Sequence, residues 1–150
     1  MCVLLAPLAA ACGETERPGL ADRLWVSDVP ASPKESFSGF AVAQVKGRSA
    51  GALYQGSMYE GRQRVFRLES RGSRVTFVMM QDGERLEAEI RNCKPTTGFH
   101  VCVELVGAAA IEGRYQSRKR WTLRRGKPSA APVDFMHLLG SLESQHAGQP

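Results

Sequence analysis

The chain has 150 residues, of which 43% are hydrophobic and 23% are charged, proportions typical of one globular domain with a sizeable core. Its net charge of +5 at pH 7 favours acidic partners over basic ones. No apolar run reaches the roughly 18 residues that a membrane-spanning helix needs, which excludes such a helix within these 150 residues.

Residues 3–12, VLLAPLAAAC, form a short apolar stretch that ends in alanines and Cys12. The stretch is too short to cross a bilayer but suits the apolar part of a secretory signal. It resembles the lipobox of bacterial lipoproteins, in which the cysteine thiol takes a diacylglycerol group and the signal is cleaved. This resemblance, confined to residues 3–12, implies a signal peptide at 1–11 and a lipidated Cys12 that begins the mature chain.

Residues 12–23 follow as a polar stretch with Pro18 and Gly19, which predicts a flexible tether. The resemblance implies that the membrane is a partner through the lipid anchor. With Gly13 after the cysteine, it also implies an outer-membrane lipoprotein facing the periplasm, and a secreted or cell-surface location is the alternative. If the apolar stretch is not a signal, it becomes a buried N-terminal segment of a cytosolic protein.

Residues 24–125 predict an all-β domain. The clearest strand, RLEAEIRN at 85–92, alternates apolar and charged side chains with a period of two, so one of its faces is wet. Weaker strands are expected within segments that contribute to the same sheet: 24–29, 37–45, 51–59 and 113–123. The total is an antiparallel meander of seven to eight strands. We predict a small up-and-down barrel, lipocalin-like in strand count and connectivity alone, over a folded sandwich.

Two glycine turns predict the register of the central hairpins. A turn at residues 82–83 places Phe77 opposite Ala88, and a turn at residues 71–72 places Phe66 opposite Phe77. Both registers keep the apolar side chains on one face. A slip of one residue would move those side chains to the face that contacts solvent.

Cys93 and Cys102 flank a short turn, KPTTG at 94–98, and fall on outward positions when Arg91 is set opposite Glu104. We expect them to form a disulfide, which an oxidising compartment preserves. Cys2 would be removed with the signal. Because the sequence contains no CxxC pair, it predicts no metal site.

A polar break interrupts the inward face at the turn near residues 60–61. Folding there aligns polar side chains with the apolar Phe66, namely Gln55, Ser57, Tyr59, Arg62 and Arg64. Together with Phe66 they form a candidate ligand pocket at one mouth of the barrel. The alternative is frayed strand ends, or a bulge at Gly56 that resets the alternation.

The last predicted strand and the residues after it are strongly basic. The candidate residues for binding an anionic surface are Arg114, Arg118, Arg120, Arg124, Arg125 and Lys127. Their partner would be anionic lipid or another envelope protein. Nucleic acid is disfavoured because aromatic residues for base stacking do not interleave with these arginines. The alternative is an edge strand that its charge keeps soluble.

The tail at residues 126–150 contains one helical pattern. Asp134 can cap a short helix whose apolar positions follow a helical spacing at Phe135, Leu138, Leu139 and Leu142. Such a helix would pack over the barrel or its end. A partner-docking peptide and a disordered tail are the alternatives.

No set of residues predicts catalysis or a cofactor. GRSAG at 47–51 matches the G-x-S-x-G pattern of hydrolases, but its place between two strands predicts a hairpin turn. His100, His137 and His146 have neither a neighbouring nucleophile nor ligand spacing. The sequence therefore predicts a non-enzymatic, membrane-anchored binding or structural-interaction module of the cell envelope. A carrier of a small ligand inside the barrel is the alternative, ahead of an enzyme of unrecognised type.

Overall fold

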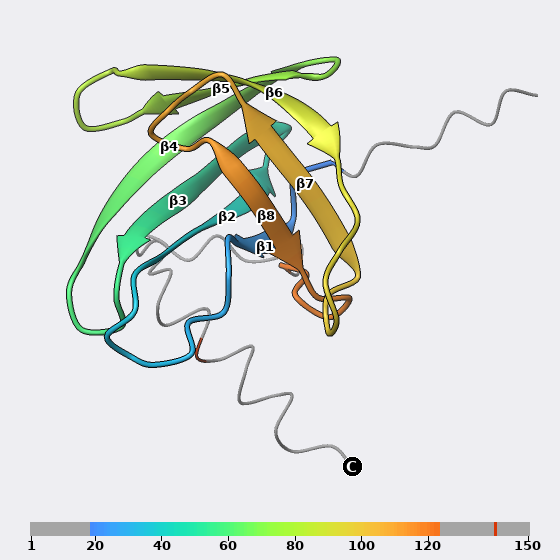
Figure 1. Cartoon of the computed structure of the whole chain (residues 1–150). Helices are drawn as coiled ribbons and strands as arrows, with labels where there is room; N and C mark the ends of the chain where they lie inside the picture. The colour runs from blue at the N-terminus through green and yellow to red at the C-terminus, as the bar shows by residue number, and fades with distance from the viewer. Residues whose placement is uncertain (1–18, 124–139, 141–150) are drawn as a thin grey trace, which may run out of the picture.

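The computed structural model describes residues 19–123 and residue 140 (Figure 1). Eight strands follow in chain order: β1 (Arg23–Val26), β2 (Phe37–Val45), β3 (Arg48–Gly56), β4 (Gly61–Arg71), β5 (Arg74–Met79), β6 (Arg85–Asn92), β7 (Val101–Val106) and β8 (Gly113–Ser117). Each strand pairs antiparallel with the next, and β8 returns to β1 at Val26 and Gln116. The predicted all-β, up-and-down barrel is confirmed.

Period-two alternation builds the interior of the barrel. On β4, β5 and β6 the buried side chains include Phe66, Phe77 and Leu86, while the residues between them are mostly charged and exposed. The ring of Phe77 lies 4.8 Å from Phe66 and 5.6 Å from Phe40, and Phe40 lies 4.9 Å from Tyr115. Aromatic rings from four different parts of the meander therefore fill the space that the barrel encloses.

Side chains from the connecting segments also close the two ends. With an even number of strands, the chain enters and leaves the barrel at one end, here called the proximal end, on the right in Figure 1. Leu20 packs into the core there, and its carbonyl oxygen accepts a hydrogen bond from Trp25 Nε1 at 3.0 Å. At the opposite, distal end, Ala108 and Ile111 from the β7–β8 connection join the same core. Among the described residues, Leu20 is thus packed into the core although it precedes residue 24.

The outside of β1–β3 is buried as well. A second apolar cluster lies there, formed by Leu24, Val26, Phe37, Ala41, Tyr54 and Trp121. Trp121 reaches it because the chain after β8 runs on beside β1, where Leu24 N donates to Trp121 O at 3.1 Å. This explains why β1, β2 and β3 lack the clear in-and-out alternation of β4, β5 and β6.

Two predicted registers are wrong by two residues, although the predicted faces are right. In β5–β6, Phe77 lies opposite Leu86 rather than Ala88, and in β4–β5, Phe66 lies opposite Met79 rather than Phe77. The β4–β5 turn is formed by residues 72–73, one position later than expected. In β5–β6, residues 80–84 form a longer connection in place of a two-residue turn.

The β2–β3 turn and the β6–β7 register agree with the predictions. Lys46 and Gly47 form the turn with positive φ values of 50° and 76°, the region that a type I′ hairpin turn uses. Ser49 therefore lies in β3, as expected for a hairpin rather than a nucleophile elbow. Arg91 lies opposite Glu104, the register that brings the two cysteines together. Within the described residues, no helix has the length and apolar character needed to cross a membrane.

Candidate functional site

The proximal end gathers basic residues from segments far apart in the sequence. The charged residues of its connections are Asp22, Lys46, Lys94, Arg118, Lys119 and Arg120, and the adjoining strand ends add Arg23, Arg48, Arg71 and Arg74. Burial lowers the pKa of Arg23, whose Nη1 donates to Arg118 O at 3.3 Å. Among these charged residues Asp22 is the single acid, so basic residues outnumber acidic ones by a wide margin at the end where the described chain enters.

A hollow of about 680 Å³ opens at this end. It lies where the N-terminal residues 19–21 meet the β2–β3 turn and the last third of β4, between Arg48 and Arg67. The hollow is next to Gly19, the point at which the described chain begins.

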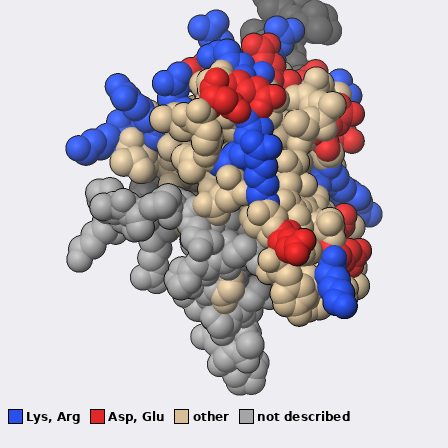
Figure 2. Space-filling view, turned by 90° about the vertical axis from the view of Figure 1, so that its left-hand side faces the viewer, with Lys and Arg blue, Asp and Glu red and all other residues tan. Residues whose placement is uncertain are grey.

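The distal end carries both signs of charge. The charged residues of its connections are Asp28, Lys34, Glu35, Glu60, Asp82, Glu84 and Glu112, and the adjoining strand ends add Arg62 and Arg85. These connections also carry most of the large apolar side chains that the described residues expose, namely Val29, Met58, Tyr59 and Met80. Figure 2 faces the side on which these loops lie and shows basic and acidic groups interspersed among uncharged ones. The barrel thus presents one strongly basic end and an opposite end that is mixed in charge and partly apolar.

The basic residues predicted to share one face of the last strand are separated by the structure. Arg114 lies on β8, whereas Arg118 follows the strand and stacks over Phe99 at 5.5 Å and Trp121 at 5.2 Å. Arg120 is exposed in the same turn. Arg124, Arg125 and Lys127 lie outside the described residues.

The predicted pocket residues line the distal mouth, where the barrel itself uses several of them. Pairing runs without a bulge from Ser49–Leu68 to Gly56–Gly61, so Gln55, Arg62 and Arg64 do lie on the inward set. Gln55 Nε2 donates across the mouth to Ala110 O at 2.7 Å. Ser57 and Tyr59 lie in the β3–β4 turn, with Tyr59 72% exposed, while Phe66 is fully buried.

Arg64 forms the main polar contact of that mouth. Its guanidinium donates to Asp82 at 3.1 Å and to Glu84 at 2.5 Å, and its side chain is 12% exposed. A hydrogen bond from the backbone N–H of Glu84 lowers the pKa of Asp82 below its ordinary value, and the positive charge of Arg64 lowers it further. Arg64 therefore fastens the β5–β6 connection to β4.

The outer face of β4–β6 is a mixed-charge surface around a hollow of about 430 Å³. Hydrogen bonds from Arg85 and Arg67, at 3.0 and 2.7 Å, lower the pKa of Glu69. Because acids and bases alternate there, the surface lacks a single sign of charge. No cluster of residues suited to a metal ion occurs in the part of the chain that the structure describes.

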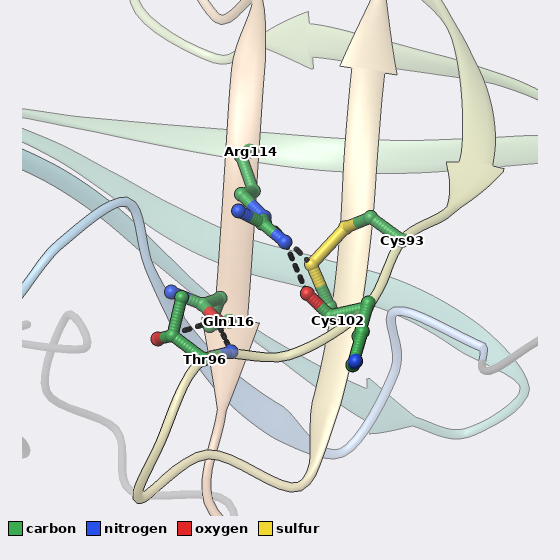
Figure 3. The surroundings of a disulfide bond; sticks show 6 residues. Cys93, Thr96, Cys102, Arg114 and Gln116 are labelled. Atoms are coloured by element: carbon green, nitrogen blue, oxygen red, sulfur yellow. Dashed lines mark hydrogen bonds between the residues drawn. A yellow bond between two sulfur atoms is a disulfide. The ribbon is translucent and has the colours of Figure 1, made fainter.

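The predicted disulfide between Cys93 and Cys102 is present, with Cα atoms 5.1 Å apart (Figure 3). It lies on the outer face, where it ties β7 to the start of the β6–β7 connection. Thr96 N donates to Gln116 Oε1 at 2.6 Å and fastens the same connection to β8. Cys12, the predicted lipidation site, lies outside the described residues, as does the predicted helix except for Gly140, which is helical.

Sequence reasoning missed Lys46, Lys94 and Lys119 as members of the basic end. They belong to three different connections, and no single stretch of sequence contains them. The signal that could have found them is topological: in an even-stranded meander, alternate connections share an end. No family model, curated protein or solved structure matches this chain.

Proposed function

We propose that this protein is a non-enzymatic, lipid-anchored module of the bacterial cell envelope that holds its proximal end against anionic lipid. The observation that supports this most is the coincidence of the basic connections with the end at which the chain enters. In this proposal the anchor is Cys12, and the localisation is the outer membrane on its periplasmic side.

The distances allow the anchored barrel to touch the membrane. Residues 13–18 span at most about 20 Å when fully extended, so the proximal end stays close to the lipid surface. Electrostatic attraction decays over about 8 Å at physiological salt, so it acts on the proximal end only because the tether keeps that end near the lipid. Each lysine or arginine near an anionic leaflet contributes about 1 kcal/mol. The basic end thus supplies a second membrane signal beside the acyl chains.

The distal end then faces away from the membrane and would meet a protein partner. Its exposed Met58 and Tyr59 are adjacent to the β1–β2 connection, since Met58 N donates to Pro33 O at 3.0 Å. The alternative function, carriage of a ligand inside the barrel, has less support from the described residues. Leu20 and Ile111 pack into the core from opposite ends, and aromatic rings fill the space between them.

The test compares charge reversal at the two ends. Lys94→Glu with Lys119→Glu changes the proximal end, and Lys34→Glu with Arg62→Glu makes the same change in net charge at the distal end. All four side chains are exposed. We expect the proximal pair to weaken binding of the purified full chain to vesicles containing anionic lipid by about thirtyfold or more, from about 1 kcal/mol per residue. The distal pair should leave that binding within about twofold.

Equal effects of the two pairs would contradict the proposed orientation. The anchor is tested separately by the mass of the protein extracted gently from the envelope of its native cells. A chain that begins at Cys12 and carries acyl groups supports the proposal. A mass that matches the unprocessed chain from Met1 would contradict both the anchor and the localisation.

A further inference from the structure

The two sulfurs of the disulfide lie in different surroundings. Cys102 is 3% exposed, whereas Cys93, directly after β6, is half-buried. Arg114 Nε lies 3.2 Å from Cys102 Sγ and is oriented to donate to it (Figure 3). The same guanidinium donates through Nη2 to Lys94 O, so two contacts fix its position beside the sulfur. A cation is thus held at one end of the bond, and the more exposed cysteine forms the other end.

This asymmetry has a chemical consequence. In thiol–disulfide exchange, the thiolate attacks one sulfur and the other leaves, and a leaving group of lower pKa leaves faster. A guanidinium at hydrogen-bond distance stabilises a thiolate over a thiol. We propose that Cys93–Cys102 is an exchange site for dithiols, in which Cys93 receives the incoming sulfur and Cys102 departs as a thiolate held by Arg114.

The reaction balances with a dithiol as the reductant. Its thiolate attacks Cys93 Sγ, a new S–S bond forms, and the Cys93–Cys102 bond breaks with its electron pair passing to Cys102. The second thiol of the dithiol, as a thiolate, then attacks its own sulfur in the mixed disulfide. Cys93 is released as a thiolate that takes up a proton, and the dithiol becomes a cyclic disulfide. Two electrons pass to the protein, and no further co-reactant is required.

Other contacts keep the two cysteines near each other after the bond opens. Thr96 donates to Gln116 from both its backbone N–H and its hydroxyl group, at 2.6 and 3.0 Å. Phe99, in the same connection, lies edge-on to Trp121 with ring centroids 6.0 Å apart. The connection therefore has attachments to the barrel besides the disulfide, which favours reversible exchange over local unfolding.

Arg91 provides a matched control for Arg114. Glu104 on β7 lies between the two arginines in register, opposite Arg91 on β6 and Arg114 on β8. Arg91 pairs with Glu89 at 3.4 Å, whereas Arg114 contacts the sulfur. The other charged or titratable side chains near the disulfide in sequence are Lys94 and His100, both on the β6–β7 connection.

The experiment measures the rate at which dithiothreitol reduces the oxidised full chain at pH 7, with acid quenching, alkylation and mass spectrometry. A neighbouring charge shifts a thiol pKa by about one to two units, and we assume that the rate depends on the leaving thiol about as strongly as on the attacking thiol, with a Brønsted coefficient of about 0.4–0.5. We therefore expect Arg114→Gln to slow reduction roughly three- to tenfold. Arg91→Gln should change the rate by less than about twofold. Arg114→Gln reduced as fast as the wild type would overturn the proposal.

A second measurement uses the wild-type protein and does not depend on how the variant folds. Brief reaction with glutathione followed by acid quenching traps the mixed disulfide, and peptide mapping locates it. The proposal requires the glutathione on Cys93 with Cys102 free. An adduct mainly on Cys102, or no adduct before the chain unfolds, would contradict it. Neither measurement involves a membrane, so a result that contradicts the disulfide-exchange proposal would leave the proposed membrane function untouched.

Discussion

Gly51 shows how one residue makes room for the aromatic core. It lies opposite Phe66 in the β3–β4 pair, and a Cβ atom at this position would lie 1.9 Å from Ala41 O and 2.8 Å from Phe66 Cζ. The first contact is with backbone that cannot move without disturbing β2. The absence of a side chain at Gly51 therefore permits both the close approach of β2 and the inward position of the Phe66 ring.

Gly51→Ala should lower the free energy of unfolding by about 2–3 kcal/mol, because overpacking forces strand or side-chain shifts. Chemical denaturation followed by tryptophan fluorescence measures the change. Gly19→Ala is the control, since nothing lies within 4 Å of the Cβ position there. If both variants lose the same stability, steric contact at Gly51 is not the cause.

Tyr115 provides a prediction of pH dependence at the same scale. Burial, opposed in part by a hydrogen bond with Ser38, raises the pKa of Tyr115 to about 12. Since the unfolded chain ionises this phenol near pH 10, its contribution to stability is complete below pH 10 and is lost as pH rises towards 12.

The free energy of unfolding should therefore fall less steeply between pH 9.5 and about 11.5 in Tyr115→Phe than in the wild type. Urea denaturation at a series of pH values tests this. Tyr59→Phe, altered at an exposed tyrosine, should keep the wild-type slope. An unchanged slope in Tyr115→Phe would show that this phenol does not titrate differently in the folded protein.

At the scale of elements, the β5–β6 connection shows why a strong turn motif did not form the turn. Asp82 and Gly83 favour a two-residue hairpin turn locally. Instead, Met80 N donates to Val65 O at 2.8 Å, which continues the β4–β5 pairing past the end of β5, and Arg64 on β4 binds Asp82. Contacts with a third strand outweighed the local preference and shifted the register by two.

Arg64→Gln should lower the free energy of unfolding by about 1 kcal/mol, because it removes the guanidinium that pairs with two carboxylates. The loss is modest because both carboxylates are half-exposed. Hydrogen exchange at the amides of Met80 and Glu84 should also become faster. Arg62→Gln, at an exposed arginine on the same strand face, should alter neither property. Faster exchange in both variants would assign the effect to general loss of charge.

At the scale of the whole molecule, the closed topology concentrates basic residues at one end. The barrel collects alternate connections at each end, so basic residues that are dispersed in the sequence gather at the proximal end. A protein with a modest net charge can thereby present a strongly basic end to an anionic surface.

Binding of the full chain to anionic vesicles should therefore weaken steeply with salt. Between 0.05 and 0.5 M salt the Debye length falls from about 14 to about 4 Å, which removes most of the attraction of the proximal end. Flotation or sedimentation of vesicles with and without anionic lipid measures the effect. Binding that is insensitive to salt would instead indicate insertion of apolar groups alone.

The sequence by itself determined which side chains face inward, how many strands to expect and which cysteines pair. Alternation has a period of two, so Phe66, Phe77 and Leu86 keep the same face whether a register is right or wrong by two residues. The Cys93–Cys102 pair follows from a short local connection. These features depend on neighbours in the chain.

The tertiary structure alone decided the registers of β4–β5 and β5–β6 and the composition of the ends of the barrel. Arg64 shifts one register through a contact with the β5–β6 connection, and Leu20 and Ile111 enter the core from connections that the local pattern leaves open. The basic end unites Lys46, Lys94 and Lys119, which no window of sequence contains together. Each of these features depends on where distant strands return, and only closure of the barrel fixes that.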